Sequence, residues 1–174
     1  GFRGGMEVED CIKVAKELQR IGADAIVLSG GFVSRAPMYV MRGQFPVRAM
    51  VHYMPLRQWW LKIGVLLGGR IVSPSIPFKR LFILEDALKF REAMPDMTFV
   101  YVGGVTTRKD ADKVIGSGFP LLQMGRAVLE DTDFVNKMMA DENHCSACEH
   151  SNFCIGRMYS LSMACHKTCK DITP

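Results

Sequence analysis

Three short, predominantly apolar runs, separated by segments with helical periodicity, constrain the fold of this 174-residue chain more than any other feature. The runs lie at 25–28, 98–102 and 119–124, and each leads into glycine. Such runs are typical of strands that are covered on both faces. Because strand and helix alternate, we predict an α/β fold with a parallel sheet and right-handed crossovers.

Helical spacing of apolar residues predicts the connecting helices, which lie at 7–21, 85–93, from Thr106 or Thr107 to about 115, and 131–139. Residues 32–83 show no clean period and are rich in proline, glycine, methionine and aromatic residues. We interpret them as a long excursion beyond the end of the first strand, with a short helix near 56–66. Long excursions inside compact domains usually carry function.

Three strands are too few for a closed eight-stranded barrel, which takes roughly 250 residues. The chain is therefore either a small open α/β sheet or the last part of a barrel whose first part is absent. Two of the strands end in glycine turns, Gly103-Gly104 and Gly125-Arg126. Strand ends of a parallel sheet line a ligand site, and glycine lets backbone N–H groups approach phosphate oxygens. We predict a phosphate site there; the alternative is two plain turns with Arg126 as a solvated cap.

The charge of the chain is unevenly distributed. The net charge is +4, yet no acidic residue lies between Asp24 and Glu85, and this acid-free segment carries eight basic residues. A field of one sign gathers anions. Because the segment also holds Trp59 and Trp60, we favour a phosphate-bearing small molecule over nucleic acid, and we predict no membrane partner.

The cysteines are equally uneven, because five of the six lie in the last 30 residues. No apolar run approaches the ~20 residues of a membrane span, and because no charged segment leads into an apolar run near the first residue given, we expect no signal peptide. We therefore predict a cytoplasmic protein with reduced thiols, which serve either metal binding or plain packing. Cys11, alone in a helical pattern, is predicted to pack as a small hydrophobic residue.

Segments 22–31, 101–105 and 118–129 resemble the last strands of the Old Yellow Enzyme family. These NADH:flavin oxidoreductases, which include bacterial 2,4-dienoyl-CoA reductases, are built on an FMN-binding (β/α)8 barrel, a TIM barrel. The resemblance implies that residues 1–140 are the C-terminal half of such a barrel and that 141–174 are a cysteine-rich tail.

The resemblance also implies roles for individual residues. Gly103 and Gly104 would contact the FMN phosphate through their backbone, Gly125 and Arg126 would complete the phosphate site, and Ser29 would lie near the flavin. The family passes hydride from NAD(P)H through flavin to an activated alkene or a similar acceptor. The catalytic proton donor would belong to the absent half, so no catalytic residue is assigned here.

The tail departs from the family pattern. Dienoyl-CoA reductase relatives bind a 4Fe–4S cluster through four thiolates near this position, whereas here Ser151 stands where a cysteine is expected. We therefore predict that the tail holds no metal. Cys145 or Cys169 as a substitute ligand, or zinc held with His150 or His166, remains the alternative.

Two other readings stay open at this point. One is a non-flavin barrel enzyme that acts on a phosphosugar, and the other is an iron–sulfur or zinc module on an α/β scaffold. We interpret Tyr53, Trp59 and Trp60 as lid or core aromatics rather than as rings that stack on adenine or flavin, and we assign His52 no catalytic role. The chain alone is expected to be inactive and to associate with itself through open sheet edges.

Overall fold

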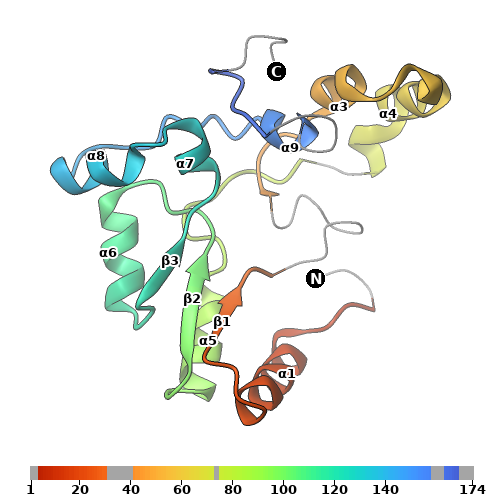
Figure 1. Ribbon diagram of the computed structural model, residues 1–174. Helices are drawn as coiled ribbons and strands as arrows, with labels where there is room; N and C mark the ends of the chain where they lie inside the picture. The colour runs from red at the N-terminus through yellow and green to blue at the C-terminus, as the bar shows by residue number, and fades with distance from the viewer. Residues whose placement is uncertain (1–3, 31–40, 73–74, 158–162, 169–174) are drawn as a thin grey trace.

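The computed structural model describes residues 4–30, 41–72, 75–157 and 163–168 (Figure 1). At its centre lies a three-stranded parallel sheet in the order β1 (Ala25–Leu28), β2 (Thr98–Val102) and β3 (Leu121–Gln123). Strands that follow one another in the sequence are therefore neighbours in space. The predicted α/β class and parallel sheet are confirmed, whereas these three strands form an open sheet and not a closed barrel.

Helices α1 (Val8–Arg20), α5 (Leu84–Ala93) and α6 (Arg108–Gly116) cover one face of this sheet. Phe99 and Tyr101 of β2 are completely buried beneath them, together with Val114 of α6. The three helices lie within one residue of their predicted bounds. Thr107 is the cap of α6, because its hydroxyl accepts the Asp110 N–H while the Asp110 carboxylate accepts the Thr107 N–H.

The opposite face of the sheet is open. Val27 is 46% exposed and Leu121 is 50% exposed, and burial alternates along β2. The prediction that the strands are covered on both faces is therefore wrong among the described residues. Right-handed crossovers between adjacent parallel strands return every helix to the same side, so only that side is covered.

The third strand and the last helix differ from their predicted bounds. Phe119 is buried but not in β3, because its N–H bonds to the Val114 carbonyl and closes the end of α6. The predicted helix at 131–139 is α8 (Phe134–Ala140), preceded by the separate short helix α7 (Arg126–Glu130). Asp131, in an extended conformation, separates the two.

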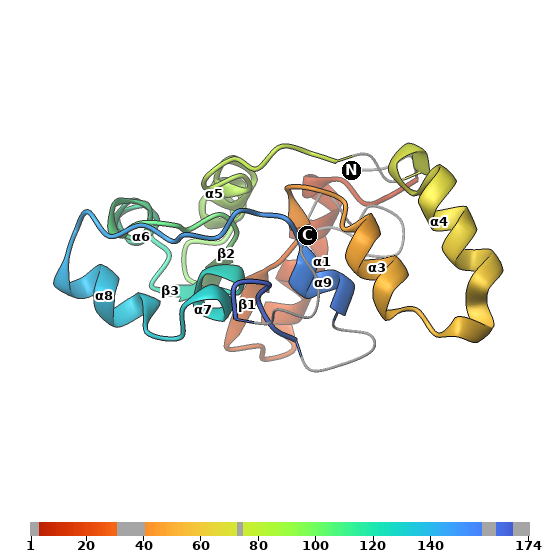
Figure 2. The same cartoon turned by 90° about the horizontal axis from the view of Figure 1, so that it is seen from above.

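The long excursion carries two α-helices, α3 (Val47–Tyr53) and α4 (Trp59–Val72), the latter preceded by the 3₁₀ turn η1 (Leu56–Gln58). The sequence therefore predicted the position of α4 but not its length, and it missed α3. Figures 1 and 2 show α4 at the periphery, while α3 packs against α9 (Phe153–Arg157) of the tail. Among the described helices, none has the length and apolar content to cross a bilayer.

Candidate functional site

The predicted site residues gather along one edge of the sheet. Leu28 pairs with Tyr101, and Val102 pairs with Gln123, so all three strands end at the same level. Ser29 and the Gly103-Gly104 turn follow β1 and β2 directly, and Gly125 lies two residues after the end of β3. The structure thus brings together, at the carboxyl edge, the backbone of the positions that the sequence singled out.

The turn after β2 requires its two glycines. Gly103 and Gly104 have φ angles of 135° and 74°, a region that other residues rarely adopt. The Tyr101 hydroxyl donates to the Gly103 carbonyl at 2.8 Å, and the Leu81 N–H donates to the Gly104 carbonyl at 3.2 Å. A Cβ at Gly104 would lie only 2.6 Å from the Leu81 nitrogen. The end of the acid-free segment therefore rests directly on this turn.

Arg126 opens α7 and connects three parts of the chain. Its Nη1 donates to the Arg42 carbonyl and to Asn152 Oδ1, both at 2.8 Å. The Asn152 amide in turn donates to the carbonyls of Arg42 (3.2 Å) and Gln44 (2.9 Å). The excursion and the tail are thus joined to the end of β3 through one guanidinium and one amide.

The positive charge of Arg126 has no acidic partner within ion-pair distance among the described residues. Burial lowers the pKa of Arg126, because the cation is largely removed from water. A half-buried cation whose hydrogen bonds go to neutral oxygens favours the binding of an anion. Gly125 beside it leaves room, because a Cβ there would meet no atom within 4 Å.

His150 lies against this cluster. Its ring stacks on Phe78 with 3.5 Å between centroids, and the Arg126 guanidinium lies 5.8 Å from the same Phe78 ring. Burial, and secondarily the charge of Arg126, lowers the pKa of His150 to about 4. The His150 carbonyl accepts the Gln44 N–H at 3.0 Å and lies so close to Gly43 that any side chain there would collide with it.

Below Arg126, the tail encloses a cavity of about 20 Å³, room for about one water molecule. Its lining combines the cation with three thiols and an imidazole: Arg126, Leu129, Cys148, Glu149, Ser151, Asn152, Phe153, Cys154, Cys165 and His166. Cys154 and Cys165 are buried, and Cys148 is half-buried. Burial raises the pKa of both the Cys148 and the Cys154 thiol, while Arg126 acts in the opposite direction.

The sequence did not predict this pocket, because its members are brought together by the fold of the tail. The cysteines share no helical or strand period, and Arg126 lies more than twenty residues before the first of them. The clustering of five cysteines in the tail was the one signal available.

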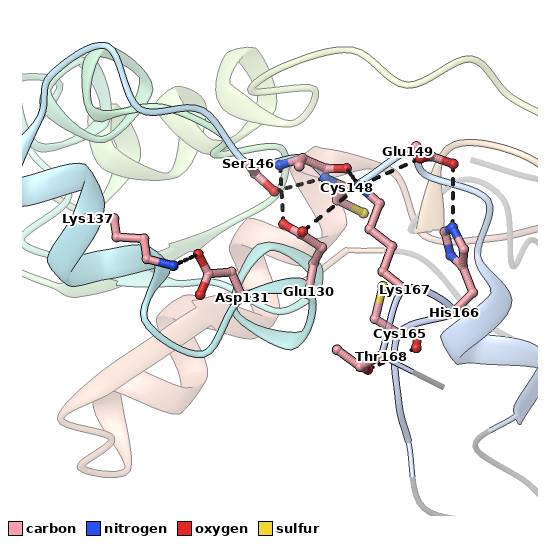
Figure 3. Close-up of polar contacts among 11 residues, drawn as sticks. Glu130, Asp131, Lys137, Ser146, Cys148, Glu149, Cys165, His166, Lys167 and Thr168 are labelled. Carbon is pink, nitrogen blue, oxygen red and sulfur yellow. Dashed lines mark hydrogen bonds and ion pairs between the residues drawn. The ribbon is translucent and has the colours of Figure 1, made fainter. Parts of the chain in front are cut away.

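Figure 3 shows how polar contacts hold the tail against α7. Lys167 Nζ lies 3.6 Å from Glu149 and 4.0 Å from Glu130, and His166 Nε2 lies 3.5 Å from Glu149. Glu130 also accepts the Ala147 N–H at 3.2 Å. Because Arg126 begins α7 and Glu130 ends it, both ends of this short helix hold the tail.

Within the described part of the tail and the rest of the described chain, no three His, Cys, Asp or Glu side chains are placed so that they could hold one metal ion. Cys169 lies outside the described residues. Cys145 is exposed, and its thiol donates to the Asn143 carbonyl at 3.4 Å. Cys145 is not among the residues that line the pocket.

The aromatic residues of the excursion do not gather at the strand ends. Trp59 and Trp60 are 64% and 62% exposed on α4, so the interpretation of these two as core residues is wrong. Tyr53 lies at the junction of α3 with the tail, where its hydroxyl accepts a hydrogen bond from Arg157 at 3.0 Å. His52 meets the edge of the Tyr53 ring, with 4.8 Å between centroids.

Comparison with known proteins gives one match that bears on function. The 4,4'-dithiodibutanoate disulfide reductase of Rhodococcus erythropolis is 29% identical to this chain over 161 residues. The match covers 92% of this chain and 39% of the relative, so the chain spans about two fifths of the relative's length. No protein-family model and no solved structure matches the chain. The relative is, by its name, an oxidoreductase that acts on a disulfide.

Proposed function

We propose that this chain is the C-terminal half of an FMN-dependent NAD(P)H oxidoreductase of the Old Yellow Enzyme type. Gly103, Gly104, Gly125 and Arg126 would bind the FMN phosphate, and Ser29 would lie toward the flavin. The observation that carries this proposal is the half-buried Arg126 cation, which has no acidic partner among the described residues and stands at the carboxyl edge of a parallel sheet.

The residues present fit a phosphate group. Among the described residues, the Arg126 side chain donates two hydrogen bonds, both from Nη1, so other donors of the guanidinium fork are available to a phosphate oxygen. Gly125 is open to approach, and the neighbouring acid-free segment adds positive potential. A charge-assisted hydrogen bond from Arg126 would therefore give a partner both to the phosphate and to the half-buried cation.

The arrangement of the sheet supports a half-barrel. Sequential parallel strands with helices on one face are the repeating unit of a (β/α)8 barrel, whose inner face is filled by side chains of all strands. Val27 and Leu121 would belong to that inner face, which is bare here. By itself the chain should then associate with further copies through the edges of β1 and β3, which light scattering would detect.

When bound, FMN would supply hydride transfer between NAD(P)H and an acceptor. The chain's own residues would hold its phosphate and raise the local concentration of anions. The acceptor would be an activated alkene, as in the family that the sequence resembles, or a disulfide, as the name of the Rhodococcus relative suggests. The substrate of that relative carries two carboxylates, which suits the acid-free segment.

The test is FMN titration of the complete polypeptide that contains this chain, with its visible spectrum recorded first. Arg126→Ala should weaken FMN roughly 5- to 150-fold, the equivalent of about 1–3 kcal/mol for a lost charge-assisted hydrogen bond. Arg20→Ala is the matched control, because Arg20 is an exposed arginine at the end of α1, paired with Glu17. Equal affinities in the two variants would contradict the phosphate site, and a colourless protein that binds inorganic phosphate would favour a non-flavin barrel enzyme.

A further inference from the structure

We propose that Cys148 and Cys154 form a disulfide-exchange centre that reduces anionic disulfides. The centre rests on the proposed function only for its regeneration, in which a reduced flavin would return two electrons. The exchange itself needs nothing beyond the thiols of this chain.

The pocket places the required thiols together. Cys148 precedes α9, Cys154 lies within it and Cys165 follows it, and all three line the same cavity. Because this cavity has room for about one water molecule, thiols that line it share a small space. Cys148 is the more accessible of the pair, because Cys154 is only 8% exposed. Cys148 is therefore placed to meet a disulfide at the mouth of the pocket, and Cys154 to attack from within.

The pocket also selects for charge. Arg126 lines it, and its charge lowers the pKa of both thiols against the effect of burial. The other titratable groups at the wall are the Cys165 thiol, which raises the pKa of both thiols, and Glu149 and His166, which pair with each other. Glu149 also pairs with Lys167. Arg126 is thus the unpaired charge of the pocket among the described residues, and it favours a disulfide that carries carboxylates.

The reaction balances within the chain and its substrate. The Cys148 thiol loses its proton, and the thiolate attacks one sulfur of R–S–S–R, which breaks that S–S bond, releases R–S⁻ and forms a Cys148–S–S–R mixed disulfide. The Cys154 thiolate then attacks the Cys148 sulfur, which releases the second R–S⁻ and forms a Cys148–Cys154 disulfide. Each R–S⁻ takes a proton from water, so two protein thiols are oxidised and one substrate disulfide is reduced to two thiols.

The neighbouring Cys145 offers the obvious competing interpretation. Cys145 and Cys148 form a C-x-x-C sequence, a spacing typical of redox dithiols. The Cys145 thiol, however, is directed to the Asn143 carbonyl and does not line the pocket. The geometry therefore selects Cys154, and not Cys145, as the partner of Cys148.

The experiment uses the reduced 174-residue chain without flavin, with Cys11, Cys145 and Cys169 replaced by serine. One equivalent of 4,4'-dithiodibutanoate should release two thiols per chain, and peptide mass mapping without reductant should find Cys148 joined to Cys154. Cys148→Ser should lower the initial rate at least tenfold. Cys154→Ser should release one thiol and leave the mixed disulfide on Cys148.

Two further arms test the assignment. Bis(2-hydroxyethyl) disulfide, which is neutral, should react several-fold more slowly than the dicarboxylate, and the difference should shrink in Arg126→Gln. The exchange rate should keep rising above pH 9, because burial raises the pKa of Cys148 and the thiolate is the nucleophile.

An unchanged rate in Cys148→Ser, or a Cys145–Cys148 disulfide in the wild-type chain, would overturn the proposal. Because no flavin is present in this assay, loss of exchange is distinguishable from a failure of the flavin proposal, which FMN titration measures separately.

Discussion

Two regions of this chain are held together by different forces. Around the sheet, large apolar side chains such as Phe99 and Phe119 fill a continuous core beneath three helices. Where the excursion meets the tail, the ties are hydrogen bonds of Arg126 and Asn152 and the close approach of Gly43 to His150. Apolar packing spreads stability over many contacts, whereas the second region concentrates it in a few atoms, so single substitutions there should have disproportionate effects.

The largest effect is expected at Gly43. Its φ angle of 113° and the collision of any Cβ with the His150 carbonyl exclude a side chain without movement of the tail. Gly43→Ala should cost more than about 3 kcal/mol of unfolding free energy, or detach the tail. Urea denaturation followed by circular dichroism, together with limited proteolysis, measures both. Gly116→Ala is the control, because a Cβ there meets nothing within 4 Å, and its cost should stay below about 1 kcal/mol.

Asn152 comes next. Alanine there removes an acceptor from Arg126 and the donor to two backbone carbonyls, at a residue that is 2% exposed and has a φ angle of 55°. The expected loss is about 2–3 kcal/mol, since buried polar groups are left without partners. Asn136, whose amide bonds to Asp133 on the surface, provides the comparison: Asn136→Ala should change stability by less than about 0.5 kcal/mol. Similar losses for the two variants would mean that the polar junction carries no special share of stability.

The same region should respond to acid. The pKa of His150 falls to about 4 in the fold, so below its ordinary value of 6.5 the unfolded chain binds a proton that the folded chain does not. This contribution to unfolding free energy should therefore be lost as the pH falls from 6.5 to 4, by on the order of 1–2 kcal/mol for a partly exposed ring. His150→Asn tolerates the positive φ and should flatten that part of the pH profile. A wild-type slope that persists in the variant would assign the effect to another group.

The smallest predicted effect has the opposite sign. Gly64 lies inside α4, where a Cβ would meet no atom within 4 Å. Gly64→Ala should stabilise the chain by about 0.5–1 kcal/mol, because alanine loses less backbone entropy than glycine in a helix. Thermal unfolding compared with wild type provides the measurement. A loss of stability would show that α4 contacts something that this structure does not contain.

The accuracy of the sequence-based predictions follows the same division between the two regions. Periodic apolar patterns and a Thr107–Asp110 cap define β1, β2, α5 and α6 locally, so these elements could be predicted nearly to the residue. The beginning of β3 could not be predicted in this way, because the Phe119 N–H bonds to the Val114 carbonyl in the turn that closes α6. The roles of Asn152 and His150 depend on atoms about a hundred residues away in sequence, and no local pattern records such contacts.

The candidate site shows the same limit. Gly103, Gly104 and Gly125 were predictable because glycine turns at parallel strand ends have a fixed geometric meaning. Among the described residues, Arg126 is half-buried without an acidic partner and shares a pocket with three thiols, and both features follow only from how the tail returns to α7. The clustered cysteines of the pocket are visible in the sequence, but their proximity to Arg126 depends on the tertiary fold.

Both tryptophans of the chain lie side by side on α4, and both are largely exposed. Emission of the indole rings will therefore report on this one helix and will be nearly blind to melting of the sheet, whose aromatic residues are phenylalanine and tyrosine. A tryptophan fluorescence titration of this chain therefore reports only on the surroundings of α4. A blue shift on adding a partner would locate that partner on α4, and separate fluorescence and circular dichroism transitions would show that α4 unfolds independently of the sheet.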